Sequence, residues 1–315
     1  MSNSTEAAGG VIPPLPDRAG PHKAGLVGGL CALGAFGSWG FLPVYFKYMQ
    51  DIPPVEILAH RIVWSVFLVG IALKLIGRFG EVAVILANKK LLGWLCVSSV
   101  LLSCNWMLYI WAVTNGHMLQ GSLGYYINPL VNVVLGVLLL SERLSRLQWV
   151  SVGLSVVAVS VLAIGLGEFP WIALSLALLF GFYGYVRKTK PVGAISGLFV
   201  ETLVVFIPAI VYLLYLGWSG QGAMGTISLG YDFLLVFAGV VTAVPLILFA
   251  AAASRLRYAT VGFFQYLAPT LQFLLAVLVY GEAFTDIHKI TFALIWTALA
   301  IYSVDTFMGR KRSLS

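Results

Sequence analysis

Ten continuous apolar stretches, each about as long as a membrane-crossing helix, constrain the fold of this chain more than any other feature of its sequence. A helix needs about 20 residues to cross the roughly 30 Å hydrocarbon core of a bilayer. Strands of transmembrane barrels alternate apolar with polar residues, and these blocks do not. We therefore predict an all-α integral membrane protein with ten transmembrane helices, at about 25–46, 56–76, 91–113, 118–140, 147–166, 169–186, 193–216, 230–252, 259–280 and 287–307.

Composition agrees with this class. Of the 315 residues, 60% are hydrophobic and 10% are charged, and the mean hydropathy is +0.95. A soluble domain averages about 25% charged residues, so a water-soluble fold is excluded.

Basic residues mark one side of the predicted bundle. If the N-terminus is cytoplasmic, all of the 19 Lys and Arg residues except Lys47, Arg61 and Lys289 fall in cytoplasmic segments. Cytoplasmic loops of membrane proteins collect positive charge. We therefore expect both termini in the cytoplasm. The same distribution accounts for the net charge of +7 without a nucleic-acid partner.

No motif for cofactor chemistry is visible in the sequence. Cys31, Cys96 and Cys104 lie in predicted spans without metal-ligand spacing, and the four His residues are scattered along the chain. The sequence has no G-x-x-x-x-G-K-[ST] phosphate loop. We therefore predict no cofactor, no metal site and no ATP-driven step on this chain.

The second half of the chain matches the first at an offset of 140 residues. At that offset Pro129 falls on Pro269 and Glu142 falls on Glu282, and the spans coincide from about residue 97 onward. The alternative is a chance match, because apolar helices resemble one another. Five helices are an odd number, so a second copy enters the membrane in the opposite sense and gives an inverted repeat. The predicted division is a disordered tail at 1–23, five-helix repeats at 24–166 and 167–308, and a basic tail at 309–315.

Two prolines stand near the centres of predicted spans. Pro129 and Pro269 each lack an N–H, and each frees the carbonyl four residues earlier, here those of Tyr125 and Gln265. We predict that both spans kink at these positions.

Amide side chains lie on one face of the same two spans. Asn128 and Asn132 follow Tyr125 at helical spacing, and Gln265 and Gln272 occupy the matching stripe of the second copy. Hydrocarbon offers these amides no partner. They are therefore expected either to line a substrate cavity or to bond neighbouring helices.

Four strings of the sequence carry a resemblance to a known family. They are EILAHRIVWS at 56–65, NWMLYIWAVTNGH at 105–117, SLGYYINPLVNVVLG at 122–136 and GLFVETL at 197–203. With them the chain resembles the RarD-type permeases of the EamA family, within the drug/metabolite transporter superfamily. The resemblance covers nearly the whole chain after the tail. It implies a ten-helix permease of the bacterial inner membrane with two inverted five-helix repeats, and it leaves the substrate open.

Three ionisable side chains, His60, Arg61 and Glu201, lie within predicted spans, and Arg61 falls on Glu201 at the offset of 140. One interpretation is a buried ion pair of Arg61 with Glu201 or with Glu56, which fixes helix packing. In the other, Arg61 binds an anionic or polar substrate group, while Glu201 carries a coupling proton with His60 as a second candidate.

The two other marked acids, Glu142 and Glu282, lie at the membrane ends of their spans, where we expect them to cap helices or to form pairs. Asn105 and Trp106 lie deep in the third span, where they form either a wall for a planar or amphipathic substrate or part of the core. The predicted substrate-binding residues are Arg61, Asn105, Trp106, Tyr109, Tyr125, Asn128, Asn132, Gln265 and Gln272.

These features favour a secondary transporter whose partners are a small-molecule substrate, membrane lipid and, as a candidate coupling ion, a proton. The alternative is an integral-membrane enzyme acting on a small amphipathic or lipid-like substrate, although no cluster of His, Asp or Glu supports it. A channel is a weaker third interpretation, because no selectivity ring is visible.

Topology gives the first testable prediction. Reporter fusions after Asn88 and after Met308 are both expected to report the cytoplasm, because the basic residues accumulate on that side. A periplasmic signal from either fusion contradicts the ten-helix arrangement.

Overall fold

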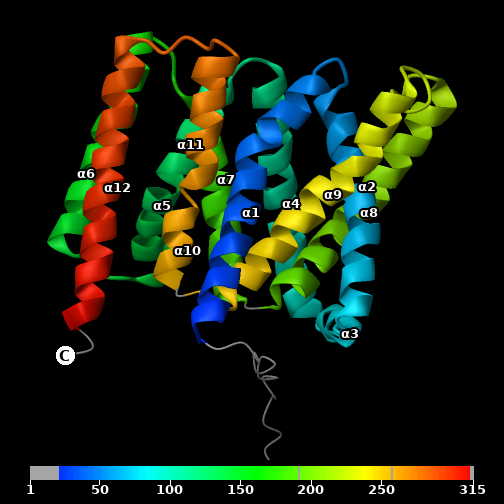
Figure 1. The fold of residues 1–315 in the computed structure, drawn as a ribbon, viewed down its shortest axis with the longest axis horizontal. Coiled ribbons are helices and arrows are strands. Elements are labelled where there is room, and N and C mark those ends of the chain that lie inside the picture. Colours follow the sequence, from blue (N-terminus) through cyan, green and yellow to red (C-terminus); the bar gives the residue numbers. More distant parts are fainter. Residues whose placement is uncertain (1–20, 191, 257, 313–315) are drawn as a thin grey trace, which may run out of the picture.

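The computed structural model describes residues 21–190, 192–256 and 258–312, and its regular structure over these residues is helical (Figure 1). The predicted tail at 1–23 lies outside the described residues except for its last three, which begin the first helix. The predicted tail at 309–315 contributes residues 309–312 to the last helix, and the rest lies outside. The elements are α1 (Pro21–Tyr48), α2 (Pro54–Leu75), α3 (Phe79–Ala87), α4 (Lys89–Thr114), α5 (Met118–Leu140), α6 (Arg146–Leu166), α7 (Trp171–Thr189), α8 (Ala194–Ser219), α9 (Leu229–Ala253), α10 (Tyr258–Phe264), α11 (Leu267–Leu274), the π-helical segment η1 (Leu275–Val279) and α12 (Asp286–Arg312).

Nine helical segments of the described residues have the length and apolarity of a membrane span. One of them, Thr260–Val279, is built from α10, α11 and η1 together. The 19-residue α7 is not among the nine, and its last turn carries Arg187 and Lys188. Each of the ten predicted spans falls on a helix, and the short α3 lies between two of them. This pattern is that of a multi-pass membrane protein.

Both ends of the described chain lie on one side of the bundle. Figure 1 places the first turn of α1 and the last turn of α12 at the same end, together with α3. A chain that starts and finishes on one side of a bilayer crosses it an even number of times.

The backbone repeats at the offset of 140 residues that the sequence suggests. Helices α2 and α8 begin at residues 54 and 194, α4 and α9 at 89 and 229, α5 and α10 at 118 and 258, and α6 and α12 at 146 and 286. The first pair of helices departs from this register, because α1 begins at residue 21 and α7 at residue 171.

The turn after the fourth helix of each half is built in the same way. Ser141 and Gly281 both adopt the left-handed conformation, with φ of 55° and 66°. The next N–H then bonds back into the helix, from Glu142 to the Gly136 carbonyl at 3.1 Å and from Glu282 to the Ala276 carbonyl at 2.9 Å. Both bonds join residues six positions apart, one more than the 6→1 bond of a Schellman motif, and both close the helix beside a residue with positive φ.

The two halves interleave in space. Helix α9 packs against α2 and α1. Its counterpart α4 packs in the same way against α8 and α7, the counterparts of α2 and α1. The contact of α5 with α7 likewise corresponds to the contact of α11 with α1. Helices α6 and α12, which are counterparts of each other, pack together. These helix contacts therefore map onto one another when each helix is exchanged for its counterpart in the other half.

Apolar residues occupy both the interior of the bundle and its outer surface. Phe46, Leu123 and Phe292 belong to the largest buried cluster, which draws on helices of both halves. Outward-facing apolar residues such as Ile164 and Leu278 remain exposed at 83% and 74%. A lipid-facing surface tolerates such residues because hydrocarbon is as apolar as they are.

Glu282 and Glu142, the two acids at the membrane ends of their spans, cap a helix and form an ion pair. The Glu282 carboxylate accepts hydrogen bonds from the N–H groups of Met118 and Leu119 at 2.8 and 2.7 Å, and so caps the first turn of α5. Glu142 pairs with Lys188 at 2.5 Å between Nζ and Oε1. The prediction that these acids cap or pair is confirmed.

Removing the cap at α5 gives the second prediction. Glu282→Ala is expected to lower the free energy of unfolding by about 1–2 kcal/mol, because it leaves two first-turn N–H groups without an acceptor. The measurement is thermal unfolding in detergent, with Glu168→Ala in an exposed loop as the control. Equal melting of the two variants contradicts the capping role.

Candidate functional site

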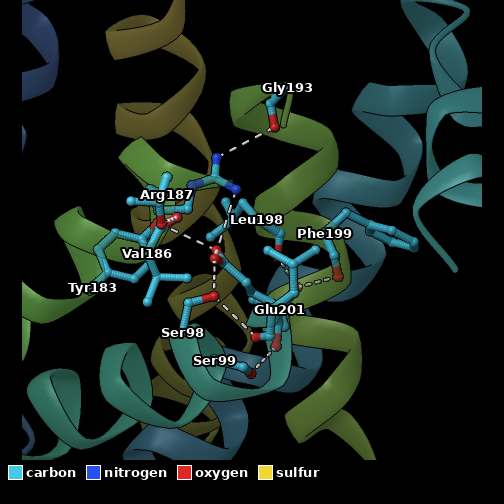
Figure 2. Close-up of polar contacts among 12 residues, drawn as sticks. Ser98, Ser99, Tyr183, Val186, Arg187, Gly193, Leu198, Phe199 and Glu201 are labelled. Carbon is cyan, nitrogen blue, oxygen red and sulfur yellow. Dashed lines mark hydrogen bonds and ion pairs between the residues drawn. The ribbon is translucent and has the colours of Figure 1, made fainter. Parts of the chain in front are cut away.

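A buried carboxylate on α8 gathers polar groups from two other helices (Figure 2). Glu201 is 1% exposed. Its Oε1 accepts a hydrogen bond from Ser98 Oγ of α4 at 2.7 Å, and its Oε2 accepts one from the Tyr183 hydroxyl of α7 at 3.3 Å. Arg187 of α7 approaches with Nη1 at 3.8 Å from Oε1. The carboxylate thus joins α4, α7 and α8.

The backbone at this point is fixed as well. Ser99 of α4 donates its hydroxyl proton to the Glu201 carbonyl. Two adjacent hydroxyls of α4 therefore hold one residue of α8, one at the main chain and one at the side chain, as Figure 2 shows. The position of Glu201 depends on the contact between α4 and α8 rather than on its own helix alone.

A missing side chain makes room for the arginine. A Cβ atom at Gly197 would overlap Nη1 of Arg187 and would lie 2.6 Å from Val192. On its other side the guanidinium donates through Nη2 to the Gly193 carbonyl at 3.5 Å. Glycine at position 197 therefore allows the guanidinium to lie against α8 near Glu201.

Arg187 is a member of this cluster that the sequence did not indicate. Its place at the end of an apolar stretch made it one of several loop charges, yet its side chain is only 17% exposed. Ser98 and Tyr183 were missed for a related reason, since nothing in their local sequence points toward α8.

The two ion pairs considered for Arg61 do not form. Arg61 is 5% exposed, and its Nε donates to Thr242 Oγ1 of α9 at 2.8 Å. Glu201 bonds to residues of α4 and α7, and Glu56 accepts from the Ala223 N–H at 2.6 Å. The interpretation of Arg61 as a member of an ion pair with Glu201 or Glu56 is wrong, because each carboxylate already has partners on other elements.

Aromatic rings surround the Arg61 guanidinium. Its central carbon lies 4.1 Å from the ring centre of Trp106 and 5.8 Å from that of Phe46. Its Nη1 is buried and has no hydrogen-bond partner. Arg61 and Trp106, which are both among the predicted substrate-binding residues, therefore lie together, and α1 contributes a ring that the sequence did not indicate.

A run of rings leads from this guanidinium toward the Glu201 cluster. Tyr109 and Tyr125 have ring centres 5.3 Å apart, Tyr125 lies 6.4 Å from Phe180, and Phe180 lies 5.7 Å from Tyr183. The last of these donates to Glu201. The buried cation and the buried carboxylate thus stand at the two ends of one aromatic row.

Two amide groups of the predicted site join neighbouring helices. Asn105 donates through Nδ2 to the Leu176 carbonyl at 3.0 Å and accepts from the Tyr125 hydroxyl at 3.4 Å. Gln272 donates through Nε2 to the Trp39 carbonyl of α1 at 3.1 Å. Both bond neighbouring helices, which is the second of the two roles considered for such amides.

The remaining predicted residues are placed differently. Asn128 is 8% exposed and its Oδ1 has no partner, and Nδ1 of the buried His60 also lacks one. Asn132 is exposed beside α7, where a Cβ at Gly181 would lie 3.4 Å from its Oδ1. Gln265 is exposed between α10 and α11.

The two prolines differ in their effect on the helix. α5 runs through Pro129 without interruption, whereas the corresponding span is divided between α10 and α11 just before Pro269. The Pro269 carbonyl accepts from Ser122 Oγ at 2.8 Å, so α5 supplies a donor at this point. A neighbouring hydroxyl is a common way to satisfy backbone groups at a broken membrane helix.

One surface groove lies away from both charges. It has a volume of about 800 Å³ and lies between α5, α10, α11 and α12, with Tyr126, Phe263, Tyr266 and Trp296 among its lining residues. A smaller groove of about 320 Å³ lies between α2 and α9. Their apolar linings suit lipid chains, so we place the candidate site at the buried polar groups instead.

Within the described part of the chain, no group of three or more His, Cys, Asp or Glu is arranged to hold a metal ion.

Known proteins resemble this chain over most of its length. The EamA-like transporter family matches residues 26–164. An uncharacterized transporter of Vibrio cholerae serotype O1 is 46% identical over 276 residues, which cover 88% of this chain and 91% of that protein. The protein RarD of Escherichia coli strain K12 is 45% identical over 286 residues, which cover 91% of this chain and 97% of that protein. The chain belongs to the EamA-like transporter family. It is a RarD-type EamA permease and thus a membrane transporter, which confirms the resemblance carried by the four sequence strings.

A solved crystal structure shares the fold of this EamA-family chain. It superposes with a TM-score of 0.55 at 18% sequence identity and covers 90% of this chain and 97% of that chain. At this identity the likeness concerns the fold alone.

The third prediction concerns the room that Gly197 leaves in this EamA-family protein. Gly197→Ala is expected to lower the free energy of unfolding by about 1–3 kcal/mol, because its Cβ displaces the Arg187 guanidinium from its place near Glu201. The matched control is Gly217→Ala on the same helix, where a Cβ meets nothing within 4 Å. That change is expected to be neutral or to stabilise by up to about 1 kcal/mol. Equal thermal unfolding of the two variants refutes the packing argument.

Proposed function

We infer that this protein is a secondary transporter of the bacterial inner membrane that moves a small molecule by alternating access between two inverted five-helix repeats. Ten crossings, with α7 as the tenth, agree with the even number that the common side of the two chain ends requires. The distribution of basic residues favours a cytoplasmic position for both termini. The exchange symmetry of the helix contacts is the arrangement expected when two repeats of opposite sense rock against each other.

The observation that carries this inference is the placement of buried charge between the halves. Arg61 of α2 reaches Thr242 of α9, and Glu201 of α8 reaches Ser98 of α4. The two contacts join equivalent pairs of helices, with a cation in one and an anion in the other. Ionisable groups within membrane spans are costly, and in transporters they mark pathways for substrates and ions.

Glu201 is the proposed site of proton coupling. As a carboxylate it attracts Arg187 and accepts from Ser98 and Tyr183. Proton uptake on one oxygen removes the charge that attracts the guanidinium and turns that oxygen into a donor. The tie between α4, α7 and α8 then weakens, which allows these helices to rearrange when the site turns toward the other face of the membrane.

The fourth prediction tests this role with Glu201→Gln. Glutamine keeps the size and much of the hydrogen bonding of the protonated carboxyl, so the variant is expected to fold and to carry substrate. It is expected to lose the response of uptake to an imposed proton gradient, because its amide does not release a proton. Purified protein in liposomes is exposed to a uniformly 13C-labelled cell extract, and mass spectrometry identifies the compounds that enter, with and without the gradient.

The matched control is Glu142→Gln. The side chain of Glu142 is 47% exposed and pairs with Lys188. It is expected to keep gradient-dependent uptake. If Glu201→Gln keeps that dependence too, the coupling role is refuted. Labelled compounds that are chemically converted and do not accumulate would support the enzyme alternative instead.

A further inference from the structure

Arg61 carries a buried charge that no carboxylate of the described residues neutralises. Its side chain is 5% exposed, and its hydrogen bond to Thr242 is to a neutral hydroxyl. Glu201, another buried ionisable side chain, has Arg187 beside it. A cation removed from water is costly unless an anion or several acceptors compensate it, so the absence of a counter-charge calls for an explanation.

Donor groups beside Arg61 are also unused. Arg61 Nη1 and the hydroxyl of Tyr109, which is 2% exposed, are both buried without a hydrogen-bond partner. Tyr109 and Tyr125 lie close enough to Arg61 for electrostatic interaction between them. Tyr45 also lies close, but its hydroxyl already donates to the Leu234 carbonyl at 2.6 Å. Phe46 contacts both groups, with its ring centre 5.8 Å from the central carbon of the Arg61 guanidinium and 6.3 Å from the ring centre of Tyr109. A guanidinium N–H and a phenol O–H in one neighbourhood are two donors suited to the two oxygens of a carboxylate.

The surrounding rings set the shape of a ligand. Trp106 stacks on the guanidinium with 4.1 Å between ring centre and charge centre, and Phe46 lies at 5.8 Å. Tyr109 and Tyr125 form a tilted pair 5.3 Å apart. Aromatic walls of this kind favour a planar, largely apolar body attached to the anionic group.

Among the described residues, the two buried glutamates of the spans, Glu201 and Glu56, already have other partners and do not face an ammonium group as a free counter-charge. Glu201 is taken up by Arg187, Ser98 and Tyr183, and Glu56 accepts from the backbone of Ala223. A zwitterionic amino acid placed with its carboxylate at Arg61 would therefore leave its ammonium group without a counter-charge.

We propose that Arg61 and Tyr109 form the anion-binding point of a substrate site that takes planar organic monocarboxylates and rejects the corresponding amines and amino acids. This proposal rests on the transport function above and names its substrate class. Neither of the two surface grooves described above includes Arg61 among its lining residues. The proposal therefore assigns ligand entry to another conformation of the transport cycle.

The test uses three probes that share one ring and differ in charge: 3-phenylpropionate, L-phenylalanine and phenethylamine. Purified full-length protein in detergent is melted over a concentration series of each. Only 3-phenylpropionate is expected to raise the melting temperature in proportion to the logarithm of its concentration. Equal stabilisation by the amine or the amino acid, or no stabilisation by the carboxylate, overturns the proposal.

Variants separate binding from folding. Tyr109→Phe removes a hydroxyl that has no partner, so it is expected to melt as the parent does and to bind 3-phenylpropionate more weakly by about tenfold. Arg61→Gln is expected to be at least as stable as the parent without ligand, because it removes an uncompensated charge, and to lose the stabilisation by the carboxylate. Lys289→Gln, at an exposed pair with Asp286, is the control and keeps it. If both site variants bind as the parent does, the site is wrongly assigned.

Liposomes distinguish this proposal from the function on which it rests. Binding of 3-phenylpropionate that depends on Arg61, without entry of any labelled compound, leaves the site standing and refutes transport. Entry of amines or amino acids that Arg61→Gln does not affect supports transport and refutes the carboxylate site.

Discussion

The carboxylate of Glu201 has to find its partners inside the protein, because hydrocarbon offers none, and the fold around it follows from that constraint. Ser98, Tyr183 and Arg187 come from two other helices, and each contributes one contact. Gly197 is part of the same arrangement, since any larger residue would occupy the place of the guanidinium. A single buried charge thus determines how closely α4, α7 and α8 approach one another, and it does so with groups that separate when the charge is cancelled.

Arg61 obeys the same constraint with a different outcome. It lies at the position equivalent to Glu201, yet the protein gives it one neutral acceptor and the faces of two rings. The aromatic faces lower the cost of burial because their quadrupoles attract a cation, but they do not cancel its charge. A structure selected for stability alone would place an acid or an apolar residue here. The uncompensated cation is therefore better explained by a ligand that brings its own negative charge.

Much of this fold could be predicted from the sequence, because each span is a continuous apolar block and each turn has a local signal. The offset of 140 residues recurs in the helix starts and in the two left-handed turns at Ser141 and Gly281. The partners of the buried charges could not be predicted in this way. Arg187 is a loop charge by its sequence neighbours, and only the packing of α7 against α4 and of α4 against α8 brings it to Glu201. The interpretation of a pair between Arg61 and Glu201 failed for the same reason. The repeat shows that the two positions correspond, but it does not show that their side chains are in contact.

Arg61 and Glu201 occupy equivalent positions but have different partners, and the proposed alternating access would affect them in opposite ways. If the two repeats exchange conformations during the cycle, the geometry of the α2–α9 contact and that of the α8–α4 contact are exchanged as well. Arg61 depends on the first contact and Glu201 on the second, so the two charged groups experience opposite changes in the same movement. A substrate anion held by Arg61 and a proton held by Glu201 are then linked without touching, since each is favoured by a different state of one rigid rearrangement. The ring contacts from Tyr109 through Tyr125 and Phe180 to Tyr183 run between the two neighbourhoods, so the linkage passes through packed helices and needs no direct contact between the two charges.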